Sequence, residues 1–216
     1  MTNLIFTNDK ITKDEFIDGG IWLNNTKTII CGTFPPRKEH LNRKGYIHYS
    51  STKNKFWKHI DKIYKTNLYL NPENEEERII NSVKKIEFLK SKQIGFIDVF
   101  SKIKRKYIDS SKDDDIIPVE TIFENGIFDK ILKSDVVQFV FVYSLSRNIF
   151  IENIKRKFKT KLTLVRRYKK DEISLEVYKV TISEKNIYLS YSPIHGKIED
   201  KYRLPALKKS IELDFD

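Results

Sequence analysis

Residues 136–143, VVQFVFVY, form the longest strand-like run in the sequence. A near-continuous run of β-branched and aromatic residues is typical of a strand that is buried on both faces, as in parallel sheets. Shorter strand-like runs lie at 28–31, 94–100, 163–165, 175–182 and 187–191. The run at 175–182 alternates between apolar and polar residues, which predicts that one of its faces is more exposed.

Between these runs, apolar residues recur at helical spacing and predict amphipathic helices. Their apolar faces are Phe56, Trp57, Ile60, Ile63 and Tyr64; Ile79, Val83, Ile86 and Leu89; Ile122, Phe123, Ile127, Ile131 and Leu132; and Ile149, Phe150, Ile154 and Phe158. A last helix is expected to start near Pro205, because proline is tolerated in a first turn.

Strands that alternate with helices favour an α/β protein. We expect a three-layer α/β/α sandwich whose mostly parallel central sheet has about four strands, with room for an extra hairpin. No linker divides the chain, so a single domain over residues 1–216 is expected.

The composition excludes several protein classes. Its one cysteine, Cys31, rules out an intramolecular disulfide and a CxxC-type metal site, and indicates an intracellular protein. We expect no signal peptide and no membrane-spanning segment, because no long apolar run is present. The 41 Lys and Arg residues against 30 Asp and Glu residues give a net charge of +11, which favours a polyanionic partner. The alternative is a generally basic proteome.

Ligands of open parallel sheets bind beyond the carboxyl ends of the strands, which selects the segments after Cys31, Phe100 and Tyr191. The first of them, residues 32–40, reads GTFPPRKEH. Glycine lets the backbone come close to a ligand, and the two prolines stiffen the turn. The segment therefore predicts backbone contacts to a base edge or a phosphate, or else an ordinary rigid strand exit.

A second segment, residues 48–58, reads HYSSTKNKFWK. His48 and Tyr49 offer planar rings that can stack on a base. Asn54 lies at the entry of a predicted helix, where its side chain can hold a water or a substrate carbonyl, or can cap the helix.

The third segment, residues 188–197, reads YLSYSPIHGK. Ser192 can bind a phosphate, and Ile194 or His195 can insert between stacked bases. A hydrogen-bonded turn is the alternative for this segment.

Together these segments resemble the uracil-DNA glycosylase superfamily. GTFPP at 32–36, a tyrosine-containing stretch and NKFW at 54–57 are similar to its opening motif, and Ser192-Pro193 resembles its second motif. GFIDV at 95–99, a basic stretch and the polar residues 110–115 are similar to the deoxyinosine (hypoxanthine) type. The resemblance covers residues 28–205.

The resemblance implies a monofunctional DNA glycosylase of base excision repair. Such an enzyme flips out a hypoxanthine, a uracil or a modified pyrimidine and hydrolyses its N-glycosidic bond through an oxocarbenium-like sugar. It needs no metal and no cofactor. We accordingly expect DNA as the partner, a monomer, and a cytoplasmic location (on the nucleoid if the source is bacterial).

The same resemblance assigns roles to individual residues. Catalysis would fall to Asn54 and Ser190. The base would be bound by Gly32, Thr33, Phe34, Pro35, His48 and Tyr49. The DNA would be bound by Ser192, Pro193, Ile194 and His195, and positive charge adds Lys104, Arg105 and Lys106 as candidates for phosphate contacts.

Two positions depart from the family pattern. Phe34 stands where many members have an Asp or Asn that orients the attacking water, and Ser190 stands where many have a His that binds the base. The alternatives are therefore a glycosylase-like module that binds DNA or a nucleotide without cutting, and an interaction protein of the same fold.

Two further basic clusters, residues 155–161 (KRKFKTK) and 166–170 (RRYKK), lie near a helix-to-strand crossing. They predict a sequence-independent grip on phosphates, or else a solvated charged surface.

Overall fold

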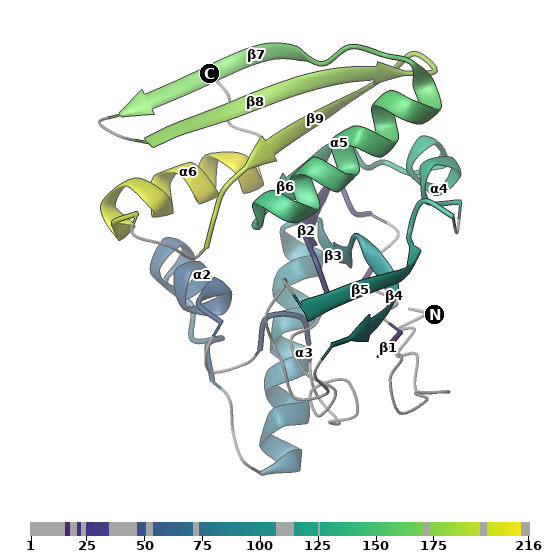
Figure 1. Cartoon of the computed structure of the whole chain (residues 1–216). Helices are drawn as coiled ribbons and strands as arrows, with labels where there is room; N and C mark the ends of the chain where they lie inside the picture. Colours follow the sequence, from purple (N-terminus) through teal and green to yellow (C-terminus); the bar gives the residue numbers. More distant parts are fainter. Residues whose placement is uncertain are drawn as a thin grey trace.

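The central sheet of the computed structural model has six strands in the order β3-β2-β6-β9-β8-β7 (Figure 1). In that order their bounds are Ile94–Asp98, Thr28–Gly32, Gln138–Phe141, Lys185–Tyr191, Ile173–Ile182 and Thr163–Lys170. The first four strands are parallel, and β8 and β7 extend the sheet as an antiparallel pair. The predicted fold class, a mostly parallel α/β sheet with an added hairpin, is confirmed.

The structure describes residues 16–17, 21–22, 25–34, 47–50, 54–70, 74–106, 115–124, 126–170, 173–194 and 198–212. Within these residues it has five helices. They are α2 (Phe56–Tyr64), α3 (Glu75–Ser91), α4 (Ile127–Lys133), α5 (Ser144–Phe158) and α6 (Asp200–Glu212). No helix among the described residues is long and apolar enough to cross a membrane.

Strands β2, β3 and β6 lie in the middle of the molecule, and all of their residues are buried. Helices cover both faces of these strands, which is why the sequence shows apolar runs instead of alternation. Strand β6 is shorter than the predicted run 136–143. The chain bends at Val142 and Tyr143, directly before α5 begins at Ser144.

Side chains that alternate along the strands form one hydrophobic core on each face of the sheet. On the first face, Ile29 and Phe139 pack with Phe128 of α4 and Phe150 of α5. On the second face, the core comprises Ile30, Phe96 and Val140 of the sheet with Phe56 and Trp57 of α2, Leu89 of α3 and Leu207 of α6. The two faces give the three layers that the sequence predicts.

A second, three-stranded antiparallel sheet has the order β1-β4-β5. Its bounds are Phe16–Ile17, Phe100–Arg105 and Ile116–Thr121. The run 94–100, predicted as one strand, is therefore divided between β3 and β4. The division falls at Val99, whose N–H donates the last hydrogen bond toward β2, to the carbonyl of Gly32 at 3.0 Å, before the chain continues as β4.

The predicted apolar face of α3 is correct for Leu89 and Ile86, which belong to or pack against the core, and wrong for Ile79 and Val83. Ile79 and Val83 are 41% and 48% exposed, whereas Asn81, Ser82 and Lys85 are buried with Leu89. Periodicity alone cannot find this face, because the polar residues on it are buried by partners that lie far away in the sequence.

Two helix boundaries also differ from the expectation. Gly126, predicted inside a helical face, adopts a left-handed φ of 72° and precedes the first residue of α4. Helix α6 begins at Asp200, and Pro205 lies inside it. Asp200 favours the earlier start because acidic residues are stabilised at helix N-termini.

Candidate active site

Four parallel strands end at one edge of the sheet, and the segments that follow them meet there. Across β2 and β3, Gly32 pairs with Asp98, and across β6 and β9, Phe141 pairs with Tyr191. The first and third predicted segments therefore leave the sheet at the same edge, with β6 between the strands that they follow. The predicted segment after Phe100 is not the exit from β3. The exit begins at Val99, because Phe100 already belongs to β4.

Gly32 lies against two polar side chains. A Cβ at this position would lie 2.5 Å from the hydroxyl oxygen of Tyr49 and closer still to a carboxylate oxygen of Asp98. Real Cβ atoms essentially never approach other atoms so closely, so a side chain at this position would require the Asp98 carboxylate and the Tyr49 hydroxyl to move. The absence of a side chain brings the end of β2 into direct contact with a carboxylate and a phenol.

His48 and Tyr49 continue this cluster. His48 Nε2 lies 3.7 Å from Asp98 Oδ2, and the imidazole stacks on Phe96 with ring centroids 5.7 Å apart. Tyr49 packs on Phe56 at 5.0 Å and has a left-handed φ of 64°, which is uncommon outside glycine. The two rings that the sequence predicts as base-stacking residues pack on aromatic residues of the protein, His48 in a stacked and Tyr49 in a tilted arrangement.

Asn54 is buried at the start of α2 and contacts two elements. Its Oδ1 accepts a hydrogen bond of 2.9 Å from the backbone N–H of Phe56, and its Nδ2 donates to the hydroxyl of Tyr143 at 3.4 Å. Asn54 thus binds the first amide of α2 in the manner of a helix cap, although Lys55 lies between it and the helix. An amide can make about four hydrogen bonds, and among the described residues Asn54 makes these two.

Asp98 dominates the electrostatics of this edge. Its side chain is 4% exposed, so water screens its charge poorly. The neighbouring thiol of Cys31 is fully buried, and burial together with the Asp98 carboxylate raises its pKa well above the usual value. Cys31 is therefore a protonated, structural thiol.

The backbone at the exit from β2 is tied to the next strand. Gly32 and Thr33 use their carbonyls to accept hydrogen bonds from Val99 (3.0 Å) and Phe100 (3.3 Å). The ring of Phe34 is buried in the hydrophobic core on the first face of the sheet. Phe34 therefore offers a ligand its backbone only.

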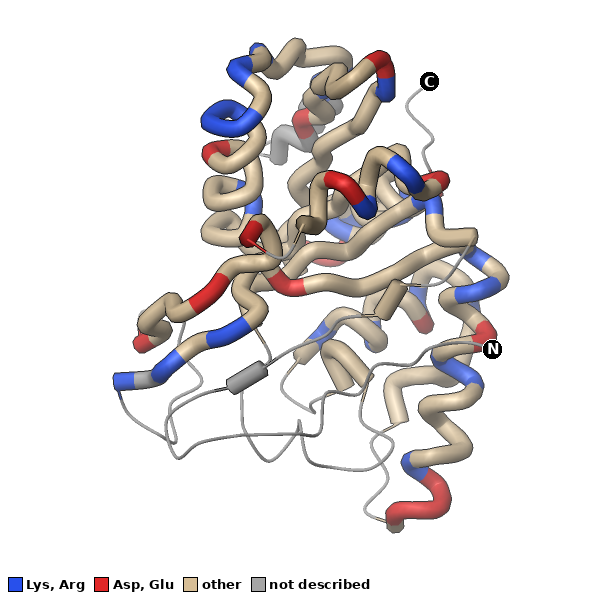
Figure 2. Tube along the Cα trace, turned by 90° about the vertical axis from the view of Figure 1, so that its right-hand side faces the viewer, with Lys and Arg blue, Asp and Glu red and all other residues tan. Residues whose placement is uncertain are grey.

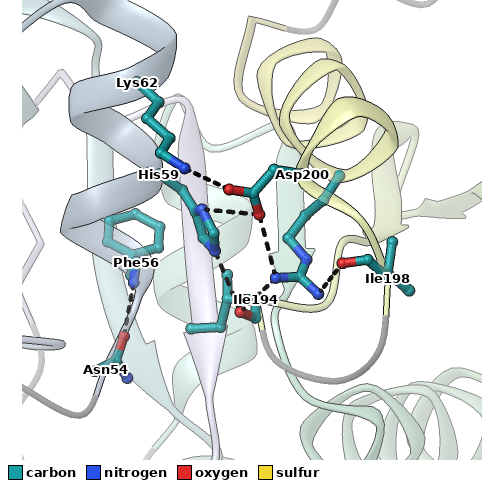
Figure 3. A network of polar contacts seen from close by, with 8 residues as sticks. Asn54, Phe56, His59, Lys62, Ile194, Ile198 and Asp200 are labelled. Atoms are coloured by element: carbon teal, nitrogen blue, oxygen red, sulfur yellow. Dashed lines mark hydrogen bonds and ion pairs between the residues drawn. The ribbon is translucent and has the colours of Figure 1, made fainter.

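The exit from β9 is fixed by a polar network between α2 and α6 (Figure 3). His59 Nε2 donates to the carbonyl of Ile194 at 3.3 Å, and Arg203 Nη1 donates to the same carbonyl at 3.4 Å. Burial lowers the pKa of His59, which favours the neutral ring. Ile194 itself is fully buried in the core on the second face, so in this conformation its side chain does not reach a ligand.

Ser192 lies at the same exit and is buried, and its backbone N–H donates to the carbonyl of Phe141 at 2.8 Å. Pro193 is half-buried beside it. Ser190 lies further back, inside β9, where its hydroxyl accepts a hydrogen bond of 3.1 Å from Gln138. Both partners are buried in the sheet, so Ser190 is separated from the edge where the other candidates meet.

The remaining predicted residues lie elsewhere. Lys104 and Lys106 are exposed at and just beyond the end of β4, and Arg105 is in the same strand. Pro35 and His195 lie outside the described residues. The site as described therefore consists of Gly32, Thr33, His48, Tyr49, Asn54, Asp98, Tyr143 and Ser192.

Asp98 and Tyr143 were not among the residues predicted from the sequence. Asp98 is a single acidic residue within an apolar strand, and Tyr143 ends the longest strand-like run. A polar residue at the end of a buried strand is the signal that marks both of them. What makes them partners of Gly32 and Asn54 is strand order, which the sequence does not reveal.

Comparisons with known proteins add no relative. Neither the protein-family models nor the curated proteins give a match to this chain. Within the described ranges, no three His, Cys, Asp or Glu side chains gather as a metal site would require. The function must therefore be argued from the geometry of the site.

Proposed function

We propose that this protein is a DNA glycosylase that hydrolyses the N-glycosidic bond of a deaminated or modified base flipped out of DNA. The observation that carries the proposal is the buried Asp98 carboxylate, packed against Gly32 at the carboxyl edge of the sheet. Burial of a carboxylate is costly, and an ordinary strand end does not need one. The net charge of +11 fits a polyanionic substrate.

The chemistry of the reaction suits this group. Departure of the base leaves positive charge on the sugar, and a carboxylate in a poorly hydrated site stabilises that charge or orients the attacking water. The second N–H and second lone pair of Asn54 are suited to hold that water or a carbonyl of the base. The edges of His48 and Tyr49 border the same place.

The test is cleavage of labelled oligonucleotides that carry uracil, hypoxanthine, xanthine or a modified pyrimidine, in single-stranded and mismatched form, followed by hot alkali. We expect strand cleavage at one of these bases. Asp98→Asn should lower the single-turnover rate about 100-fold or more, because a preorganised electrostatic contact is lost. Binding of the oligonucleotide should be retained.

The matched control is Asp129→Asn, which removes an exposed carboxylate on α4. This variant should cleave the oligonucleotide at the same single-turnover rate as the wild-type protein. Equal rates for the two variants would remove Asp98 from the mechanism, and absence of cleavage at every base would refute the glycosylase proposal.

A second prediction separates the two roles of Asn54. Asn54→Ser keeps an uncharged oxygen that can cap α2 but loses the amide N–H groups, and Ser and Asn cap helices about equally well. We expect the free energy of unfolding to stay within about 0.5 kcal/mol of wild type while turnover falls at least tenfold. Urea unfolding and the cleavage assay measure the two quantities. Turnover within about twofold of wild type would leave Asn54 as a helix cap only.

One observation favours a second function, a module that binds DNA without cutting it. Ser190 and the ring of Phe34 are both buried away from the site edge, so neither can replace the polar groups that many glycosylases have at these positions. This alternative predicts salt-dependent DNA binding and no abasic product.

A further inference from the structure

A cavity of about 700 Å³ opens between α5 and the outer part of the sheet. We call it the α5 groove; its walls include Arg147, Ile151 and Lys155 of α5, Lys161 and Leu162 after the helix, and Tyr178 of β8. In Figure 1, α5 lies beside β8 and β9. Ligand pockets commonly measure about 300–1,000 Å³, so the α5 groove has the size of a ligand site.

The groove carries excess positive charge. Arg147, Lys155 and Lys161 line it, and among the described residues neither lysine forms an ion pair. Its acidic residue, Glu176, is bound by Arg167 at 2.8 Å and by the Tyr178 hydroxyl at 2.6 Å. Figure 2 marks the lysines and arginines along the trace in blue. An anionic ligand would therefore be favoured in the groove.

Flat and apolar surfaces lie next to these cations. Tyr178, Ile151 and Leu162 are half-buried and form part of the wall. A smaller cavity shares Arg147 and Tyr178 and extends to Tyr191, over whose ring the Arg147 guanidinium lies at 4.6 Å. Tyr191 ends β9, so the smaller cavity extends from the residues shared with the α5 groove to the carboxyl edge of the sheet.

We propose that the α5 groove binds a nucleotide unit of a single-stranded nucleic acid, with the phosphates on Arg147, Lys155 and Lys161 and the base against Tyr178. Only an unpaired base can lay its face on a tyrosine, and stacking of this kind tolerates any sequence. A free nucleotide carries the same chemistry. The proposal does not depend on glycosylase activity.

The test is fluorescence anisotropy with a short labelled oligothymidylate, titrated at several KCl concentrations. Lys155→Ala/Lys161→Ala should weaken binding and lower the slope of log K against log salt by about 1.4, since each phosphate contact to a single strand contributes about 0.7. Tyr178→Ala should weaken binding about fivefold or more, whereas Tyr178→Phe, which keeps the ring, should bind like the wild-type protein.

The charge-matched control is Lys84→Ala/Lys90→Ala, which removes two exposed lysines from α3 on the other face of the sheet. Equal weakening by the two double variants would overturn the proposal, because the effect would then reflect net charge alone. Unchanged binding by Tyr178→Ala would overturn the placement of the base.

Competition with thymidine monophosphate distinguishes the two sources of the ligand. If the monophosphate displaces the oligonucleotide from wild type and not from Lys155→Ala/Lys161→Ala, the groove is a nucleotide pocket. If only oligonucleotides compete, it is a strand-binding groove. All of these measurements use undamaged DNA. A negative cleavage assay together with groove-dependent binding would therefore refute the glycosylase and leave the groove standing.

Discussion

Lys85 lies on α3 with 3% of its surface exposed, and its ammonium group donates a hydrogen bond of 2.8 Å to the hydroxyl of Ser50. The same group lies 5.1 Å from the centre of the Trp57 ring. Burial lowers the pKa of Lys85 to about 8, and the nearby Asp61 opposes this shift. Burial of the protonated Lys85 side chain near neutral pH therefore lowers the free energy of unfolding by about 3 kcal/mol.

This burial makes the stability of the protein depend on pH. Between about pH 8 and the ordinary lysine pKa of 10.5, the unfolded chain holds a proton on Lys85 that the folded chain has released. The contribution of Lys85 to the free energy of unfolding should therefore rise with pH across this window, by about 1.4 kcal/mol per unit at most. Below pH 8 the penalty is fully present.

Lys85→Met removes the titrating group, so its free energy of unfolding should lack this rise. Urea unfolding of wild type and of the variant at several pH values from 7 to about 10 measures the difference. Lys84→Met, at an exposed neighbour, is the control and should follow the wild type. Parallel curves for wild type and Lys85→Met would show that Lys85 is not buried as described.

At the scale of elements, the polar network between α2 and α6 fixes the exit from β9. Asp200 at the start of α6 pairs with Lys62 of α2 at 2.5 Å and with Arg203 at 3.7 Å. The hydrogen bond from Lys62 lowers the pKa of Asp200, and Arg203 donates to the carbonyl of Ile198 at 2.7 Å. Arg203 is 4% exposed, whereas Lys62 is largely solvated.

Because Arg203 is buried and Lys62 is exposed, replacement of these two residues should lower the free energy of unfolding by different amounts. Arg203→Met removes the donor of the Ile198 carbonyl and one of the two donors of the buried Ile194 carbonyl, and leaves Asp200 without its buried partner, so it should lower the free energy of unfolding by about 2–4 kcal/mol. Lys62→Met breaks an exposed ion pair and should cost less than about 1 kcal/mol. Urea unfolding at neutral pH checks both values. Equal costs would mean that Arg203 acts only as a surface charge.

A helix or strand can be predicted from the sequence when its own residues record how it is buried, and not when distant residues decide which side is buried. The buried strands were found because burial on both faces leaves an apolar run in the sequence itself. The polar part of the buried face of α3 was missed because Lys85 is buried by Ser50 and Trp57, which are distant in sequence. The start of α6 predicted from Pro205 was too late in the sequence. A proline does not exclude helix before it when other contacts support the first turn.

At the scale of the whole molecule, alternation of strands and helices was sufficient to predict the layers and the edge at which the candidate residues meet. The composition of the site was predicted less well. Asp98 reaches the edge through its register with Gly32, and Ser190 lies inside the sheet, where Gln138 donates a hydrogen bond to it. Both facts depend on which strands are neighbours, and one sequence does not specify that order.

The close packing at Gly32 also has a genetic consequence. Every missense change of a single base in a glycine codon introduces a side chain with a Cβ, and at this position even the smallest one collides with Asp98 and Tyr49. A point mutation at this codon therefore displaces the Asp98 carboxylate and the Tyr49 hydroxyl together, so the positions of both groups depend on the absence of a side chain at residue 32.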